Sequence, residues 1–338
     1  KELLQTLTSF LILSNIILIG IAILILQYYL LLSKSLFELV PLGIVIIITC
    51  ASSIGLGLWK INLRFERESF KYFILTSGKA LAGSAISLLL IVWLHFGALG
   101  MLLAPMVISI VLLIVFFLRY IKSFCINAVI IKEALVFCYP LVLSAFFAIF
   151  IIHFDRIVVE RIHNNSEFAL YNIATNVATY IGVFAIAILQ AIEPDIFTLT
   201  SDKKGWLLIK IFFSFILILI FILICFSYLS FPIVNYLTAG LYNGADKYVT
   251  SMVLLKFLEQ IVYFLGFIAI ALKMSKVILM NQILIFTILI FLLLHYIPNY
   301  AYWGAIYVKI SVFTFWIIIL ILEIIFRNSP IITRLRLR

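Results

Sequence analysis

The sequence predicts an all-α polytopic membrane protein with about ten transmembrane helices. Its 338 residues are 66% hydrophobic and only 11% charged, whereas a soluble domain carries about 25% charged residues. Apolar segments of the length that crosses a bilayer, about 20 residues, recur along the whole chain. Segments of about ten residues with alternating polar and apolar positions, which indicate a β-barrel, do not appear in it. This composition excludes a soluble fold and a disordered chain.

Each expected helix is an apolar segment bounded by charged or turn-forming residues. The uncharged stretch 80–118 is too long for one span, and Gly97 and Gly100 divide it. The first helix lacks the short apolar region and cleavage site of a signal peptide. We expect helices near 7–32, 36–58, 72–95, 98–118, 134–153, 168–190, 206–230, 248–271, 277–295 and 301–326.

The basic residues predict the orientation of these helices. Alternate loops, starting from the N-terminus, hold 17 of the 24 basic residues, and the other loops hold four. The richer side is cytoplasmic by the positive-inside rule, so both termini are expected in the cytoplasm. The net charge of +10 is therefore attributed to topology rather than to nucleic-acid binding.

An internal repeat is suggested by the second to fourth helices and the eighth to tenth. In each set a His (His95, His295) precedes a short uncharged turn. The turns read Gly97-Ala98-Leu99-Gly100-Met101 and Ala301-Tyr302-Trp303-Gly304-Ala305. A six-helix period predicts two parallel lobes. The first lobe then lacks its first two helices, which agrees with Lys rather than Met at position 1. We expect a partial N-terminal lobe at 1–125, and a six-helix C-terminal lobe with a basic tail at 126–338.

Motifs in the middle of the chain resemble a known family. They are Lys132-Glu133-Ala134-Leu135, Tyr139-Pro140-Leu141, Phe154-Asp155-Arg156-Ile157-Val158, Leu170-Tyr171-Asn172-Ile173-Ala174, Glu193-Pro194-Asp195-Ile196-Phe197 and Leu237–Ala245. This ordered set is similar to the flippases that export lipid-linked O-antigen and capsule repeat units. Those proteins share a superfamily of multidrug, oligosaccharidyl-lipid and polysaccharide exporters with the MATE drug antiporters. In the family pattern an Asp-Arg marks the outer end of the seventh helix, and a Pro ends the eighth.

The resemblance implies a function as well as a fold. A flippase would move undecaprenyl-pyrophosphate-linked oligosaccharide across the bacterial cytoplasmic (inner) membrane by alternating access. Its expected partners are that lipid-linked oligosaccharide, membrane lipids and other polysaccharide assembly proteins, with no nucleic acid, cofactor or metal. We expect no enzymatic activity.

Four charged residues lie more than five residues from either end of an expected span, where charges are costly and usually face a cavity or a partner. Lys256 and Glu259 share a helix face, so they form either a structural ion pair or a site at which Lys256 meets a phosphate. For Lys309 the alternatives are a structural role and a substrate-facing role. Lys79 lies about two turns from the cytoplasmic end, where a snorkelling side chain is the alternative to a substrate contact.

Four further residues are candidates through the resemblance. Asp155 and Arg156 are expected at the outer end of their helix, either as an ion-pair gate at the outer mouth or as ordinary solvated charges. Asn176 is either a cavity residue or a hydrogen-bonding residue between helices. Pro140, near the expected start of its helix, is either a moving hinge or a fixed kink.

Other functions fit the sequence less well. It contains no phosphate-binding loop and no Cys/His metal spacing. A MATE-type drug antiporter shares the fold but favours acidic cavity residues, whereas three of the four charges deep inside the expected spans are Lys. A membrane O-antigen polymerase needs a large outer loop, and the outer loops here reach about 17 residues. A purely structural scaffold is the remaining class.

Overall fold

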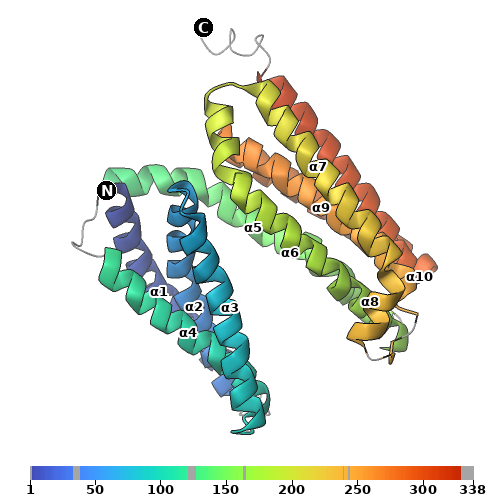
Figure 1. Cartoon of the computed structure of the whole chain (residues 1–338), viewed down its shortest axis with the longest axis horizontal. Helices are drawn as coiled ribbons and strands as arrows, with labels where there is room; N and C mark the ends of the chain where they lie inside the picture. Colours follow the sequence, from blue (N-terminus) through green and yellow to red (C-terminus); the bar gives the residue numbers. More distant parts are fainter. Residues whose placement is uncertain are drawn as a thin grey trace. The chain divides into compact units, whose positions relative to one another are not determined.

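The structure, a computed structural model, describes residues 2–32, 39–120, 127–162, 165–238, 240–242 and 244–328. Within these ranges all regular secondary structure is helical, and nine helices are long and apolar enough to cross a membrane (Figure 1). The prediction of an all-α polytopic membrane protein is therefore confirmed. The chain divides into two compact units, Lys1–Leu135 and Val136–Arg338. This division lies ten residues beyond the lobe boundary expected after residue 125.

The first unit is built from α1 (Glu2–Leu32), α2 (Leu39–Phe65), α3 (Ser69–Val92) and α4 (Gly97–Tyr120). Its core consists of apolar side chains from α2, α3 and α4, namely Leu56, Trp59, Leu63, Leu75 and Phe116. Helix α2 was expected to end at residue 58 and extends to Phe65 instead. The extension follows from packing, because Trp59 and Leu63 lie beyond the apolar span and are both buried.

The second unit has a more extensive core. It contains most of α5 (Ala128–Ile162), followed by α6 (Asn165–Ser201), α7 (Gly205–Tyr228), the short α8 (Ser230–Leu237), α9 (Asp246–Ala271) and α10 (Ser275–Asn328). Helix α9 lies at its centre, packed against α6, α7 and α10 (Figure 1). More than half of α9 is buried, compared with about a tenth of α7. A helix enclosed on most sides must satisfy its polar residues within the protein.

Helix α10 is two spans joined by a sharp reversal. Ala301 has non-helical backbone angles, φ 51° and ψ −134°. The arms then run side by side, because Asn281 in the first arm donates a hydrogen bond to Glu323 in the second. The two separate spans expected at 277–295 and 301–326 correspond to these arms.

Two helices of the second unit are longer than the apolar pattern predicted. The segments expected at 134–153 and 168–190 extend over 128–162 in α5 and 165–201 in α6. Pro194, expected to end the second of these, lies inside α6. Proline removes one helical hydrogen bond, but Ile196 beyond it is fully buried and its packing favours continued helix. Pro140 is consequently the thirteenth residue of α5 rather than a residue near its start.

Three turns share one backbone geometry with a basic residue in the left-handed conformation. Arg67, Lys203 and Lys273 have φ of 57°, 56° and 58°, and they connect α2 to α3, α6 to α7 and α9 to α10. In each turn this residue donates its N–H to the carbonyl three residues back, and the next residue donates to the one five back. These are the two hydrogen bonds of a Schellman motif. All three turns belong to the face expected to be cytoplasmic.

The opposite turns show features expected of the repeat. Gly97 and Ala301 occupy matching positions in the two motifs and have φ of 50° and 51°. Three residues later, Gly100 and Gly304 are both tightly packed. A Cβ at Gly100 would lie 3.0 Å from a side-chain atom of α3, and one at Gly304 would lie 2.8 Å from a backbone oxygen of the first α10 arm. A shared requirement for a small residue supports the predicted relation between the two hairpins.

Candidate functional site

A polar cavity of about 210 Å³ lies inside the second unit between α5, α6, α9 and the second arm of α10. Aromatic contacts hold these helices together. Phe286 on α10 packs against Phe147, Phe150 and Phe154 on α5, and the rings of Tyr171, Tyr248 and Tyr302 join α6, α9 and α10. The cavity is lined by Ile152, His153, Asp155, Arg156, Thr175, Ala178, Thr179, Met252, Leu255, Lys256, Glu259, Lys309 and Phe313.

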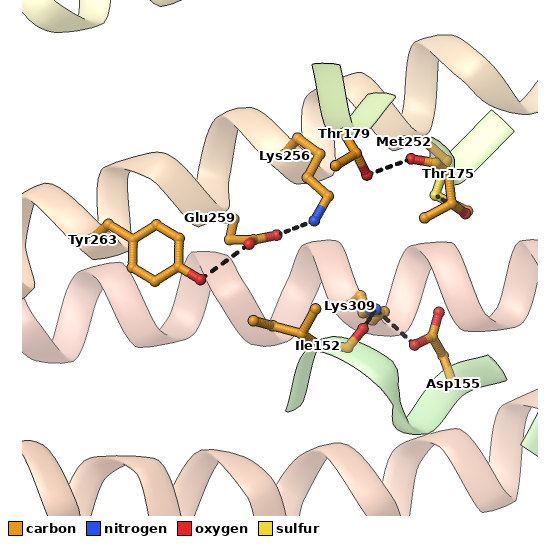
Figure 2. Close-up of polar contacts among 9 residues, drawn as sticks. All are labelled: Ile152, Asp155, Thr175, Thr179, Met252, Lys256, Glu259, Tyr263 and Lys309. Atoms are coloured by element: carbon orange, nitrogen blue, oxygen red, sulfur yellow. Dashed lines mark hydrogen bonds and ion pairs between the residues drawn. The ribbon is translucent and has the colours of Figure 1, made fainter. Parts of the chain in front are cut away.

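A buried ion pair joins α5 to α10 at this cavity. Lys309 Nζ lies 2.8 Å from Asp155 Oδ1 and 2.8 Å from the carbonyl oxygen of Ile152, and it donates to both (Figure 2). The hydroxyl of Tyr171 on α6 donates to the other carboxylate oxygen. The side chains of Lys309 and Asp155 are only 6% and 2% exposed. Charges this deep are tolerated because each meets an opposite charge and further hydrogen bonds.

A second ion pair lies within α9. Lys256 Nζ is 2.7 Å from Glu259 Oε2, and the hydroxyl of Tyr263 donates to Glu259 Oε1 at 3.2 Å (Figure 2). The three residues are three and four positions apart, so they share one face of the helix. The Lys256 and Glu259 side chains are 13% and 10% exposed. This pair is therefore more accessible than the first and belongs to a single helix.

The two pairs have a common pattern, in which each carboxylate binds one lysine and one tyrosine hydroxyl. The cavity lining carries three cationic side chains and two carboxylates. Because the two lysines neutralise both carboxylates, Arg156 is the cation without an acidic partner among the cavity-lining residues. The cavity therefore has an excess of one positive charge with His153 neutral.

Hydroxyl groups of α6 complete the lining. Thr175 donates to the carbonyl of Tyr171. Thr175 also contacts Met252 Sδ at 3.7 Å, and Thr179 donates to the carbonyl of Thr175 at 2.8 Å (Figure 2). Because their hydrogens serve their own helix, these hydroxyls present acceptor lone pairs to the cavity. Asn176, an expected site residue, is exposed and is not part of this lining.

Five of the eight candidate residues thus surround one cavity: Lys256, Glu259, Lys309, Asp155 and Arg156. The position expected for Asp155 and Arg156 was wrong. They lie inside α5, which continues to Ile162, rather than at its outer end. Both oxygens of Asp155 are occupied by Lys309 and Tyr171, so the ion pair that Asp155 forms is with Lys309 of α10.

Lys79 and Pro140 lie away from this cavity. Lys79 belongs to the first unit, where Nζ lies 3.5 Å from Ser53 Oγ on α2. It lines a separate, mostly apolar cavity of about 430 Å³. Pro140 is buried in α5 and lies outside the polar lining.

Sequence reasoning missed the two tyrosines. Tyr263 lies four residues after Glu259, a spacing that places both on one helix face. This signal could have identified it. Tyr171 belongs to the motif Leu170–Ala174, but nothing in its local sequence indicates that its partner is Asp155 on another helix.

Comparisons with known proteins identify the fold. No family model matches the chain, and no curated protein matches it. Solved structures do match. An outward-facing multidrug resistance MATE family transporter of the MOP superfamily has a TM-score of 0.73 and 13% identity, over 97% of this chain and 79% of that one. A mutant of the Vibrio cholerae MATE transporter VcmN has a TM-score of 0.78 and 13% identity, over 98% and 80%.

A third similar structure differs in its described pocket. It is a MOP superfamily transporter from Pyrococcus furiosus, with a TM-score of 0.70 and 14% identity over 97% of this chain and 83% of that one. Its binding pocket is described as having reverse polarity, which suggests a different function for that protein. At these identities the similarity shows that the chain has the fold of these transporters.

Proposed function

We propose that this chain is a membrane transporter, or most of one, that moves an organic solute by alternating access. The support is a transporter fold matched over 97–98% of the chain, together with a buried, charged cavity inside the second unit. Ionisable residues inside a membrane protein are costly to bury and commonly mark a substrate or ion pathway.

We further propose that the cargo carries an anionic group, and the observation behind this is the charge of the cavity. Both carboxylates are neutralised by lysines of the same chain, while Arg156 lies in the lining without a carboxylate partner there. A planar guanidinium suits bidentate binding of phosphate oxygens. The exchangeable pair Lys256–Glu259 offers a second cation, because an incoming phosphate can replace the glutamate.

The cavity size indicates how much of the cargo it holds. Drug-sized ligands occupy pockets of about 300–1,000 Å³, and the cavity measures about 210 Å³. It therefore suits a charged headgroup better than a whole lipid-linked saccharide. Together with the motifs from Lys132 to Phe197, this supports a lipid-linked oligosaccharide pyrophosphate as cargo. The corresponding location is the bacterial cytoplasmic membrane with both termini cytoplasmic.

A MATE-type export of cationic drugs is the second candidate, and the solved structures of similar fold support it directly. In this chain a cationic drug would have to displace Lys256 from Glu259, or Lys309 from Asp155, before a carboxylate became available. The pocket of reverse polarity in the Pyrococcus furiosus protein supports the view that cargo charge varies on this fold.

A vesicle assay separates these candidates. The purified protein is reconstituted into liposomes that contain either a fluorescent isoprenyl-pyrophosphate-linked saccharide or entrapped ethidium. We expect headgroup translocation, and Arg156→Ala should slow it by about 10- to 150-fold, because a charge-assisted hydrogen bond contributes about 1.5–3 kcal/mol.

The controls for this assay come from the same chain. Arg156→Lys retains the charge and should retain part of the rate, and Lys247→Ala removes a cation outside the cavity. Ethidium movement without headgroup movement would establish the second candidate. Movement of neither probe, in vesicles that contain folded protein, would contradict a transport function.

A further inference from the structure

We propose that Lys309 is a built-in counter-cation, whose ammonium group fills a buried oxygen-lined site that would otherwise bind a free monovalent cation. The inference concerns the cavity of the proposed function, but it is about ion binding and can be tested without any cargo.

The surroundings of the ammonium group are those of a bound cation. Its nearest oxygens are Asp155 Oδ1 and the Ile152 carbonyl, both at 2.8 Å and both from α5. Carboxylate and backbone carbonyl oxygens are the ligands that hard cations prefer. The two oxygens belong to residues three positions apart, so one turn of α5 directs them to the same point. Figure 2 shows the Lys309 nitrogen between Ile152 and Asp155.

The site requires a positive charge. Asp155 is 1% exposed, and the Tyr171 hydroxyl satisfies only one of its oxygens. Removal of the ammonium group would leave a carboxylate oxygen and a carbonyl oxygen facing each other in a site whose side chains are almost fully buried. An unpaired buried charge is strongly unfavourable, so a cation from solution that fits the space would bind there.

The other ion pair is a control within the same cavity. Glu259 accepts hydrogen bonds from Lys256 and Tyr263 of its own helix, and within the part of the chain that the structure describes the Lys256 ammonium has no backbone carbonyl partner. Its side chains are also more exposed. Loss of Lys256 would therefore open Glu259 to the water of the cavity rather than create an enclosed oxygen site.

A tethered cation has a direct consequence for energy coupling. A free ion can bind on one side of a membrane and leave on the other, which couples its gradient to cargo movement. The Lys309 ammonium cannot leave, because it belongs to the chain. The Asp155 site is therefore filled in this structure without Na⁺ or K⁺.

The test measures cation binding to the purified protein in detergent. Melting temperatures are recorded in NaCl, KCl and choline chloride at equal ionic strength, since choline is too large for the site. Wild-type protein should melt at the same temperature in all three salts. Lys309→Ala should melt lower in choline, and NaCl or KCl should raise its melting temperature saturably. Asp155→Asn added to Lys309→Ala should abolish that rise.

Two matched variants complete the design. Lys309→Met fills the space without charge and should show no cation response, and Lys256→Ala should show none because its site is open. The proposal is overturned if folded Lys309→Ala ignores Na⁺ and K⁺. It is equally overturned if the wild type shows a saturable cation response that Asp155→Asn removes, a result obtainable even if Lys309→Ala does not fold. Neither result bears on whether the protein transports cargo.

Discussion

Replacing Lys309 with Met is expected to destabilise the protein far more than replacing Lys256 with Met. Both substitutions remove an ammonium group and leave a carboxylate. Asp155 and Lys309 are 1% and 5% exposed, lie 154 residues apart in sequence, and join α5 to α10. Breaking a buried ion pair by removing one partner costs about 3–5 kcal/mol. Because Asp155 keeps the Tyr171 hydrogen bond, we expect a loss of about 3 kcal/mol.

The Lys256 pair should contribute less. It lies within one helix, at a spacing that contributes about 0.2–0.5 kcal/mol in exposed helices, and its partial burial raises that value to about 1 kcal/mol. The two variants should therefore differ by about 2 kcal/mol. For a folded unit of about 200 residues, such as the second unit, a change of 1 kcal/mol in unfolding free energy shifts the melting temperature by about 2–4 °C. Lys309→Met should melt about 6–12 °C below wild type, and Lys256→Met only a few degrees below.

The measurement is thermal unfolding of purified protein followed by tryptophan fluorescence. A double-mutant cycle with Asp155→Asn isolates the pair, because the double variant buries no unpaired charge and should recover most of the lost stability. Equal destabilisation by Lys309→Met and Lys256→Met would refute the reasoning. So would a double variant that is no more stable than Lys309→Met alone.

Three further outcomes are expected. Gly304→Ala should lower the melting temperature by several degrees, because its Cβ would approach a backbone oxygen to 2.8 Å. The control Gly266→Ala, whose Cβ would have no atom within 4 Å, should be neutral or slightly stabilising, and the opposite order of melting temperatures would contradict this packing. Tyr171→Phe should cost about 1.5–3 kcal/mol in unfolding free energy, since it removes a buried hydrogen bond to a carboxylate, and an unchanged melt would count against that bond. A cysteine in place of Lys203 should react with an impermeant maleimide only from the cytoplasmic side, and one in place of His95 only from outside. Labelling of both from the same side would reject this topology, and the exchanged pattern would reverse the orientation.

Much of the fold could be predicted because spans are determined by composition. About 20 apolar residues are enough to identify a span, and the two arms of α10 were separated by this rule alone. Helix ends were less predictable. Lys60 and Arg64 belong to α2 although they end its apolar stretch, because a helix can continue beyond the hydrocarbon region wherever Trp59 and Leu63 still have a core to enter.

The site was predictable to a similar extent. Lys256, Glu259 and Lys309 stand out because a charge inside an apolar segment is costly and rare. An ion pair could be predicted from the sequence spacing only for Lys256 and Glu259, which share a helix. The pairing of Lys309 with Asp155 depends on how α5 packs against α10. Tyr263 could have been identified from its spacing to Glu259, whereas Tyr171 is one of 16 tyrosines in the chain and its partner Asp155 lies on another helix.

The three left-handed turns at Arg67, Lys203 and Lys273 involve a compromise between two requirements. A residue with a Cβ in this conformation costs roughly 1 kcal/mol or more, and glycine is the usual choice there. Glycine at these positions would relax the backbone but remove three positive charges from the face predicted to be cytoplasmic. If that orientation holds, the requirements of membrane insertion and of folding stability act in opposite directions at these residues. A glycine-substituted triple variant would be more stable once folded, yet more prone to insert the wrong way round.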